Sequence, residues 1–195
     1  MNNIVLRGYL RDIQFSHFQG DIEYEKANLI CPRGGGKEED IISLRYKKLV
    51  NKHHDGDFIE LKGNLRSYST QVDGKNNVQV YVFTYFDVPE EIPLDNVSID
   101  GRVCKINTVS VDGVVKTHFI LANNIFTNNG KKINSYIPCI AFGSLAEELS
   151  LLQVNDFIQV YGEIHSHCYT KTDNDVKEFK VAHEVQVKKV TKIDG

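Results

Sequence analysis

Basic and aromatic side chains alternate along two predicted strands in the first half of this chain. The residues that share one outward face are Arg7, Tyr9, Arg11, Lys62, Arg66 and Tyr68. Cations bind phosphate oxygens and flat rings stack on bases, so this pattern suits contacts to a nucleic-acid backbone. A solvated strand face that binds nothing would show the same alternation, and the residues alone leave both interpretations open.

The histidines do not form a recognisable metal site. His53, His54 and Asp55 are adjacent in a predicted turn, and His165 and His167 share a strand face. A zinc site needs three or four converging ligands, and no further set occurs at suitable spacing. We therefore expect no metal and no other cofactor, and we interpret His165 and His167 as nucleic-acid contacts.

The glycine-rich segment 31–37 is the other motif with a chemical interpretation. It resembles a phosphate-binding P-loop only superficially, because the leading glycine is missing and Glu38 stands where Ser or Thr is needed after Lys37. No nucleophile–base pair and no carboxylate pair stands out elsewhere. The sequence thus predicts a binding protein and not an enzyme.

An internal repeat sets the number of domains. Residues 57–67 (DFIELKGNLRS) return as residues 156–166 (DFIQVYGEIHS), with their glycines 162 − 63 = 99 positions apart. This spacing predicts two small domains, at residues 1–92 and 93–195, each large enough to bury a core. A short linker over residues 89–95 is expected between them.

Period-two alternation dominates both halves, as is typical of half-buried strands. A glycine inside each repeated strand, Gly63 and Gly162, indicates a sharp bend. One short helix is expected before each repeated strand, over residues 144–152 and, a turn shorter, from Tyr46. This order predicts an all-β chain with one short helix per domain, folded as two tandem five-stranded OB-fold barrels. Antiparallel sandwiches share much of the pattern.

Charge is nearly balanced, with 23 Lys and Arg against 26 Asp and Glu. Neither half is polybasic, so nucleic-acid binding would depend on local patches and stacking. No apolar run is long enough for a signal peptide or a membrane span, and the four cysteines are isolated. We expect a cytoplasmic location, in a bacterium or in the host of a phage, with no membrane partner.

The second half resembles the bacterial and phage-type single-stranded DNA-binding proteins. The segments that carry the resemblance are 119–122 (FILA), 141–147 (AFGSLAE) and 155–162 (NDFIQVYG), and the match spans almost all of residues 96–187. Members of this family use aromatic side chains as platforms for successive bases. For each single ring, a place in the hydrophobic core is the alternative. The positions that the resemblance assigns to stacking are Phe126, Tyr136, Phe142 and Tyr169.

The first half keeps the frame of the repeat but has few of these rings. When the two halves are aligned, the first-half residues that match the four stacking positions are, in order, Gly34, Asp40, Tyr46 and Thr70. The stacking candidates of the first half are therefore Tyr46, Tyr9 and Tyr68. Phosphate candidates come from the strand faces and from loops that would close over DNA. They are Arg7, Arg11, Arg33, Lys37, Lys62, Arg66, Arg102, Lys131 and Lys132.

The resemblance implies sequence-tolerant binding and protection of single-stranded DNA in replication, recombination or repair. In this interpretation the second half stacks bases and the first half mainly guides the backbone. The family assembles four OB folds, so a homodimer is expected, with replication or recombination proteins as further partners. Two alternatives stay open: an OB-fold adaptor of a primosome or replisome with weak nucleic-acid binding, and an RNA-binding module.

Overall fold

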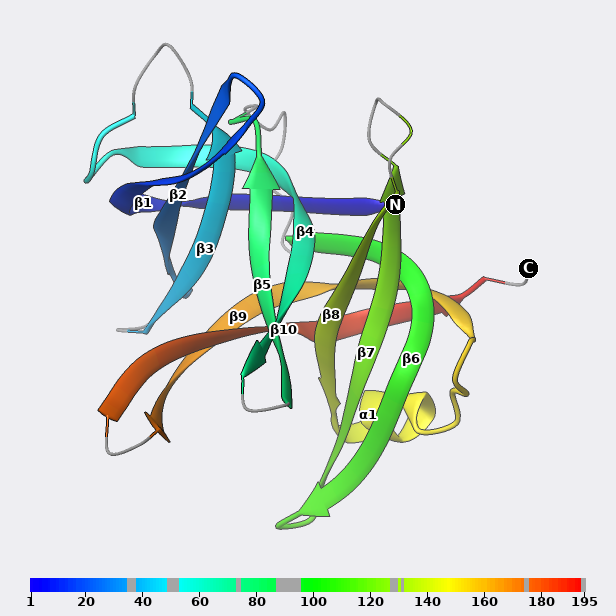
Figure 1. Cartoon of the computed structure of the whole chain (residues 1–195). Helices are drawn as coiled ribbons and strands as arrows, with labels where there is room; N and C mark the ends of the chain where they lie inside the picture. The colour runs from blue at the N-terminus through cyan, green and yellow to red at the C-terminus, as the bar shows by residue number, and fades with distance from the viewer. Residues whose placement is uncertain are drawn as a thin grey trace.

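The computed structural model describes residues 1–34, 38–48, 53–72, 75–86, 96–126, 130, 132–173 and 176–193. The strands of the first half are β1 (Asn2–Gln19), β2 (Ile22–Pro32), β3 (Glu39–Lys47), β4 (Phe58–Val72) and β5 (Lys75–Thr84). Those of the second half are β6 (Val97–Val111), β7 (Val114–Phe126), β8 (Lys132–Phe142), β9 (Phe157–Asp173) and β10 (Val176–Lys192). The one helix in these described residues, α1 (Gly143–Leu149), follows β8 along the chain and lies against β7 and β8 (Figure 1).

Each half closes into a five-stranded barrel with the same pairing. In the first barrel β1 pairs with both β2 and β4, and a parallel pairing of β3 with β5 completes the closure. In the second barrel β6 pairs with both β7 and β9, and β8 pairs in parallel with β10. A first strand shared between two neighbours belongs to a closed barrel and not to a sandwich. The predicted tandem OB fold is therefore confirmed.

The expected helices differ between the two barrels. In the second barrel, α1 buries Leu149, while Leu145 and Leu152 pack partly buried against the core. In the first barrel Tyr46 belongs to β3, and the described residues form no helix; residues 49–52 lie outside them. The expected linker, and with it the domain boundary after residue 92, also falls outside the described residues.

The strand parity predicted from the repeat is confirmed in the two cores. Side chains on alternate positions of β4 and β9 point inward, and their neighbours along the chain are more exposed. This is the period of two that a pleated strand imposes. The buried apolar side chains of these two strands are Ile59, Leu61, Leu65, Ile158, Val160 and Ile164.

Close backbone packing accounts for the glycine in each repeated strand. A Cβ atom on Gly162 would lie 2.2 Å from the carbonyl oxygen of Gln186 in β10. A Cβ atom on Gly63 would lie 2.8 Å from the carbonyl oxygen of Phe83 in β5. Since only glycine allows this approach, it lets β4 and β9 curve between their two neighbouring strands.

The two barrels join edge to edge through β1 and β6. Residues 2–4 pair antiparallel with residues 97–99, so the ten strands form one continuous sheet in the described residues. The Asn2 side-chain amide donates to the Leu65 carbonyl oxygen at 2.7 Å and to Asn123 Oδ1 at 2.9 Å. These bonds attach the start of β1 to both barrels.

Matched serines show that the barrels are related by an approximate twofold axis. The Ile41 N–H of β3 donates to Ser166 Oγ of β9 at 2.8 Å, and the Tyr136 N–H of β8 donates to Ser67 Oγ of β4 at 2.7 Å. Ser67 and Ser166 are 166 − 67 = 99 positions apart, like the repeat glycines. Ile41 and Tyr136 are consequently equivalent, at a spacing of 136 − 41 = 95.

We predict that Gly162→Ala destabilises the protein, because the new methyl group would overlap the Gln186 carbonyl. Overpacking of this kind lowers the free energy of unfolding by about 1–3 kcal/mol, which urea denaturation measures. Gly34→Ala is the matched control, since nothing lies within 4 Å of its Cβ position. Equal unfolding free energies for the two variants would contradict this role of Gly162.

Candidate nucleic-acid interface

Three of the predicted stacking rings lie on one outer face of β7 and β8. Phe126 is 70% exposed, Tyr136 is 44% exposed and Phe142 is 39% exposed. Phe126 pairs with Lys132 and Phe142 pairs with Lys116, and directly paired residues share a face of the sheet. The Lys116 Nζ atom lies 5.7 Å from the Phe142 ring centroid. Two of the three rings on this face therefore lie directly beside a lysine.

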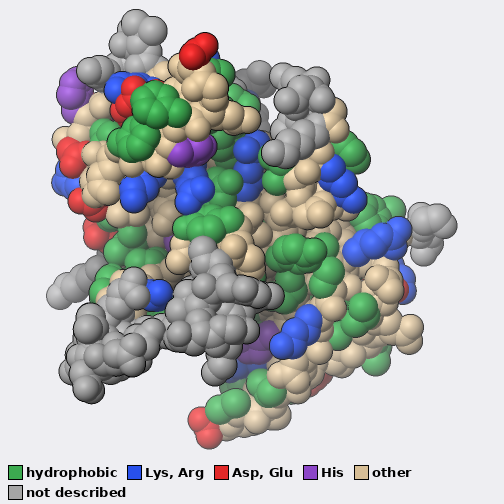
Figure 2. Space-filling model, in the orientation of Figure 1, with side chains coloured by type: hydrophobic (Ala, Val, Ile, Leu, Met, Phe, Trp, Pro, Cys, Tyr) green, Lys and Arg blue, Asp and Glu red, His purple; other side chains and the backbone are tan. Residues whose placement is uncertain are grey.

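The rings on this face are spaced as separate platforms. At about 3.3 Å per residue, Phe126 and Tyr136 stand about 13 Å apart along the strands, and Tyr136 and Phe142 about 20 Å apart. Figure 2 shows hydrophobic and basic side chains next to one another over the second barrel, on the right of the view. Acidic side chains gather mainly over the first barrel, at the upper left.

Tyr169 lies apart from these three rings, where β9 extends past the first barrel. Its side chain is exposed, and its ring lies 6.3 Å from the ring of His167. It lines a groove between the two barrels, to which Tyr68 of β4 also contributes. The structure thus brings together two predicted stacking residues that are 169 − 68 = 101 positions apart in the sequence.

The outer face of β1 displays its predicted cations and ring. Arg7 and Arg11 are exposed, and so is Tyr9 between them. The Tyr9 ring packs edge-on against Phe58 of β4 at a centroid distance of 5.1 Å. This pair forms an exposed aromatic surface with cations on both sides.

The predicted cations of β4 are less exposed. Lys62 and Arg66 are both half-buried. The Arg66 guanidinium carbon lies 3.8 Å from the ring centroid of Phe83, a cation–π contact within the first barrel. Arg66 is therefore already engaged by a ring of its own barrel.

The prediction that Tyr46 stacks on bases is wrong. Its side chain is 4% exposed and belongs to the core of the first barrel. The ring packs against Phe86 at a centroid distance of 4.6 Å. Burial, reinforced by Glu25, raises the pKa of the Tyr46 hydroxyl far above its usual value.

A register error of one residue explains the wrong assignment of Tyr46. The sequence comparison placed Tyr46 opposite Phe142, 142 − 46 = 96 positions away. The serine hydrogen bonds relate Ile41 to Tyr136, so the spacing of β3 and β8 is 95. The structural equivalent of Tyr46 is therefore Ala141, which is fully buried. A slip of one residue moves every side chain to the opposite face of a strand.

Two of the four remaining phosphate candidates are accessible in the described residues. Lys132 and Arg102 are exposed, and the Arg102 guanidinium donates to the carbonyl oxygen of Asn155 at 2.9 Å. Lys37 and Lys131 lie outside the described residues. Of these four cations, the structure supports Lys132 and Arg102 as accessible groups.

Arg33 is engaged within the protein instead of being free for a phosphate, which corrects its assignment. Its guanidinium donates to the two Asp40 oxygens at 2.9 and 2.7 Å and to Glu38 at 2.9 Å. It also donates to the backbone oxygen of Ser166 at 3.1 Å. Because Ser166 belongs to the second barrel, Arg33 and Asp40 fasten the two barrels together.

Asp40 is the centre of this interbarrel cluster. Its buried carboxylate also accepts hydrogen bonds from the His165 ring at 3.0 Å and from the Ser166 N–H at 2.6 Å. Burial alone would raise the pKa of Asp40, but the bonds from His165, Arg33 and Ser166 outweigh it and hold that pKa well below its usual range. The bond to Asp40 raises the pKa of His165. His165, predicted as a nucleic-acid contact, is thus part of the junction.

The sequence-based assignments included Tyr68 but missed Arg45 and Tyr81, which pack with it on the outer face of β3, β4 and β5. The Arg45 guanidinium carbon lies 4.4 Å from the Tyr68 ring centroid and 4.6 Å from that of Tyr81. The signal was present in residues 81–85 (YVFTY), where aromatic residues occupy every second position. This spacing places the rings on one face of the strand.

The histidine pair near the start of β4 contacts a single carboxylate. His53 Nδ1 and His54 Nδ1 lie 4.0 and 3.9 Å from one oxygen of Asp57. Among the residues that the structure describes, no group of three or more His, Cys, Asp or Glu side chains could hold a metal ion. Within the same residues, no helix has the length and apolar character needed to cross a membrane.

Solved structures with this fold include single-stranded DNA-binding proteins. The protein from Thermus aquaticus matches with a TM-score of 0.72 and 17% identity, over 100% of this chain and 94% of that chain. A deletion mutant of it matches with the same score and identity, over 95% of that chain. A Plasmodium falciparum complex with single-stranded DNA has a TM-score of 0.45 and 20% identity, over 54% of this chain and 100% of that chain. No family model and no curated protein matches the chain significantly. The Thermus match confirms the tandem fold.

We predict that the stability difference between the wild type and His165→Gln depends on pH. Gln keeps a hydrogen-bond donor for Asp40 but carries no charge. Folding raises the pKa of His165. The contribution of this residue to the free energy of unfolding is therefore complete below its unfolded-state pKa of about 6.5 and is lost as pH rises through its folded-state pKa. The wild type should therefore exceed the variant in melting temperature most at about pH 5.5 and least at about pH 8.5.

Two features of this comparison isolate His165. Burial lowers the pKa of His183, so this residue destabilises the folded protein as pH falls. The effect has the opposite sign to that of His165, but it is the same in the wild type and the variant and cancels in their difference. The same His165→Gln substitution made on an Asp40→Asn background is the control, because the carboxylate that pairs with His165 is then absent, and this difference should vary much less with pH. A constant difference for His165→Gln in the otherwise wild-type protein would contradict the charged pair with Asp40.

Proposed function

From the premise that this chain has the same tandem OB fold as the Thermus aquaticus protein, we propose that it binds single-stranded DNA with little sequence preference. The observation that carries the proposal is the outer face of β7 and β8, where Phe126, Tyr136 and Phe142 are exposed. Lys132 and Lys116 lie beside Phe126 and Phe142 on this face. Such a protein protects single strands during replication, recombination or repair. It performs this role by binding and needs no catalytic group.

In this proposal, base stacking on aromatic rings and phosphate neutralisation by lysines both contribute to the affinity. Each base that stacks on an aromatic ring contributes about 1–3 kcal/mol, and every base has a π-face, so stacking is tolerant of sequence. Lys116 and Lys132 lie beside Phe142 and Phe126, where they would neutralise phosphates and release condensed counterions. Affinity should therefore fall as the salt concentration rises.

The first barrel has a different part in this proposal. Arg7 and Arg11 are exposed on β1. Between them Tyr9 packs its ring against Phe58 of β4. Cations in this arrangement position a phosphate backbone without reading its bases. The second barrel would thus supply most of the stacking energy, and the face of β1 would mainly guide the strand.

We also propose that two copies of the chain assemble, so that four OB folds act together. The exposed tip of the β6–β7 hairpin supports this proposal, because Val109, Val111 and Val114 lie there in solvent. An apolar tip of this kind is a surface that a second copy can cover.

We expect Phe126→Ala combined with Tyr136→Ala to weaken binding of oligo-dT by about 25-fold or more, since two stacking platforms are lost. Fluorescence anisotropy with a labelled oligo-dT of about 30 nucleotides measures the loss. Both rings are exposed, so the variant should keep the wild-type melting temperature.

Tyr9→Ala combined with Phe58→Ala is the matched control in the first barrel, because it also removes two exposed rings. It should weaken binding far less. Equal losses for the two double variants would refute the division between the barrels. Absence of single-stranded DNA binding by the wild type would refute the proposed function and favour a protein adaptor.

For the assembly, light scattering should give the mass of a dimer. One chain has a mass of 22.2 kDa, so a dimer has 2 × 22.2 = 44.4 kDa. Val111→Asp should shift the mass toward that of one chain, since a carboxylate at the hairpin tip opposes apolar packing. A wild-type mass of one chain at micromolar concentration would contradict the dimer.

A further inference from the structure

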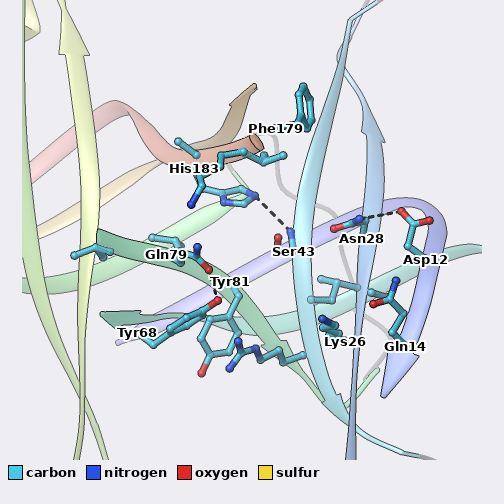
Figure 3. Close-up of a pocket in the computed structure, with 18 of the residues that line it drawn as sticks. Asp12, Gln14, Lys26, Asn28, Ser43, Tyr68, Gln79, Tyr81, Phe179 and His183 are labelled. Carbon is cyan, nitrogen blue, oxygen red and sulfur yellow. Dashed lines mark hydrogen bonds between the residues drawn. The ribbon is translucent and has the colours of Figure 1, made fainter. Parts of the chain in front are cut away.

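A groove of about 350 Å³ lies where the two barrels meet. In the first barrel, β3 and β5 pair only over residues 44–46 and 82–84, and the groove occupies the gap beside this short pairing. The β9–β10 hairpin of the second barrel closes the other side. Figure 3 shows Tyr68 and Tyr81 on one side of Ser43, and Phe179 and His183 on the other. The volume lies in the range of small-ligand sites.

The first wall of the groove is a stacked group of three side chains. The Arg45 guanidinium lies 4.4 Å from the Tyr68 ring and 4.6 Å from the Tyr81 ring, and the two ring centroids are 5.9 Å apart. The Tyr68 hydroxyl donates to the side-chain oxygen of Gln79, which fixes the orientation of its ring. All three planar groups are held in place before any ligand arrives.

The opposite wall is aromatic and comes from the second barrel. Tyr169 of β9 and Phe179 of β10 line the groove, and Phe179 is 66% exposed. His183 Nε2 lies 2.8 Å from the Ile41 carbonyl oxygen, so it donates to β3 and holds β10 against the first barrel. The position of the aromatic wall is therefore fixed by the junction between the barrels.

The charge of the groove suits an anionic strand. Its basic lining residues in the described part of the chain are Lys26, Arg45 and Lys180, against one acidic residue, Asp12. The Asp12 carboxylate accepts a hydrogen bond from the Asn28 side chain at 3.0 Å. Aromatic planes combined with excess positive charge match a nucleobase attached to a phosphate backbone.

We propose that this interbarrel groove is a nucleobase site to which both barrels contribute. A base of the bound strand stacks there between the Arg45–Tyr68–Tyr81 group and the rings of Tyr169 and Phe179. This inference rests on the proposed function and extends it, because the first barrel then stacks bases through residues that have no counterpart in the β7–β8 platform. The strand would pass from that platform into the groove.

The test measures the affinity of the full chain for an oligo-dT of about 30 nucleotides after Phe179→Ala and, separately, after Tyr81→Ala. Loss of one stacking ring should weaken binding by roughly 5- to 140-fold. Phe18→Ala is the matched control, since Phe18 is 64% exposed, close to the value for Phe179, and lies outside the groove. Melting temperatures establish that each variant is folded.

The outcomes separate the groove from the proposed function. Weaker binding by Phe179→Ala and Tyr81→Ala, with Phe18→Ala at the wild-type level, supports the nucleobase site. Wild-type affinity in Phe179→Ala and Tyr81→Ala, with the β7–β8 double variant still weakened, overturns the groove and leaves the proposed function intact. A wild type that binds no oligo-dT overturns the proposed function and the groove with it.

Discussion

The antiparallel pairing of β1 with β6 is the contact on which the rest of the structure depends. Residues 2–4 and 97–99 pair there, so two strand edges that would otherwise expose unpaired backbone groups are satisfied. Because equivalent strands meet at their starts, an approximate twofold axis brings β3 against β9 and β4 against β8. The serine hydrogen bonds, the Asp40 cluster and the groove all lie along these secondary contacts.

Because of the approximate symmetry, the junction of β3 with β9 can be compared directly with the junction of β4 with β8. At one junction Asp40 meets Arg33 and His165 in a charged, hydrogen-bonded cluster. At the other, Ser135 occupies the position equivalent to Asp40, 135 − 40 = 95, and its buried hydroxyl has no hydrogen-bond partner among the described residues. Arg66 takes the place of His165, 165 − 66 = 99, and stacks on a ring. The charged cluster thus occurs at one junction only, while the hydrogen bond from the Tyr136 N–H to Ser67 Oγ links the barrels at the other.

The predictions from sequence succeeded where one strand contains all the information. The repeat, the inward face of each strand and the glycine bends follow from alternation and spacing within a few residues. The residue-by-residue equivalence of β3 and β8 does not follow in this way. The spacing between the two copies is 99 in the repeat but 95 in these strands, because the connecting segments differ in length. The wrong stacking assignment of Tyr46 has this cause, since a comparison offset by one residue exchanges a core position with an exposed one.

By itself the sequence determined two tandem barrels and the inward face of each repeated strand, because strand parity is a local property. The family resemblance added the stacking positions Phe126 and Tyr136, and the structure places both rings in solvent. Only the tertiary structure decided what the polar and aromatic groups meet. Arg33 lies against a carboxylate of its own barrel and a carbonyl of the other, while Arg45 and Tyr81 face rings of the second barrel across a groove. These contacts join residues on different barrels, and no pattern within one strand encodes their separation in space.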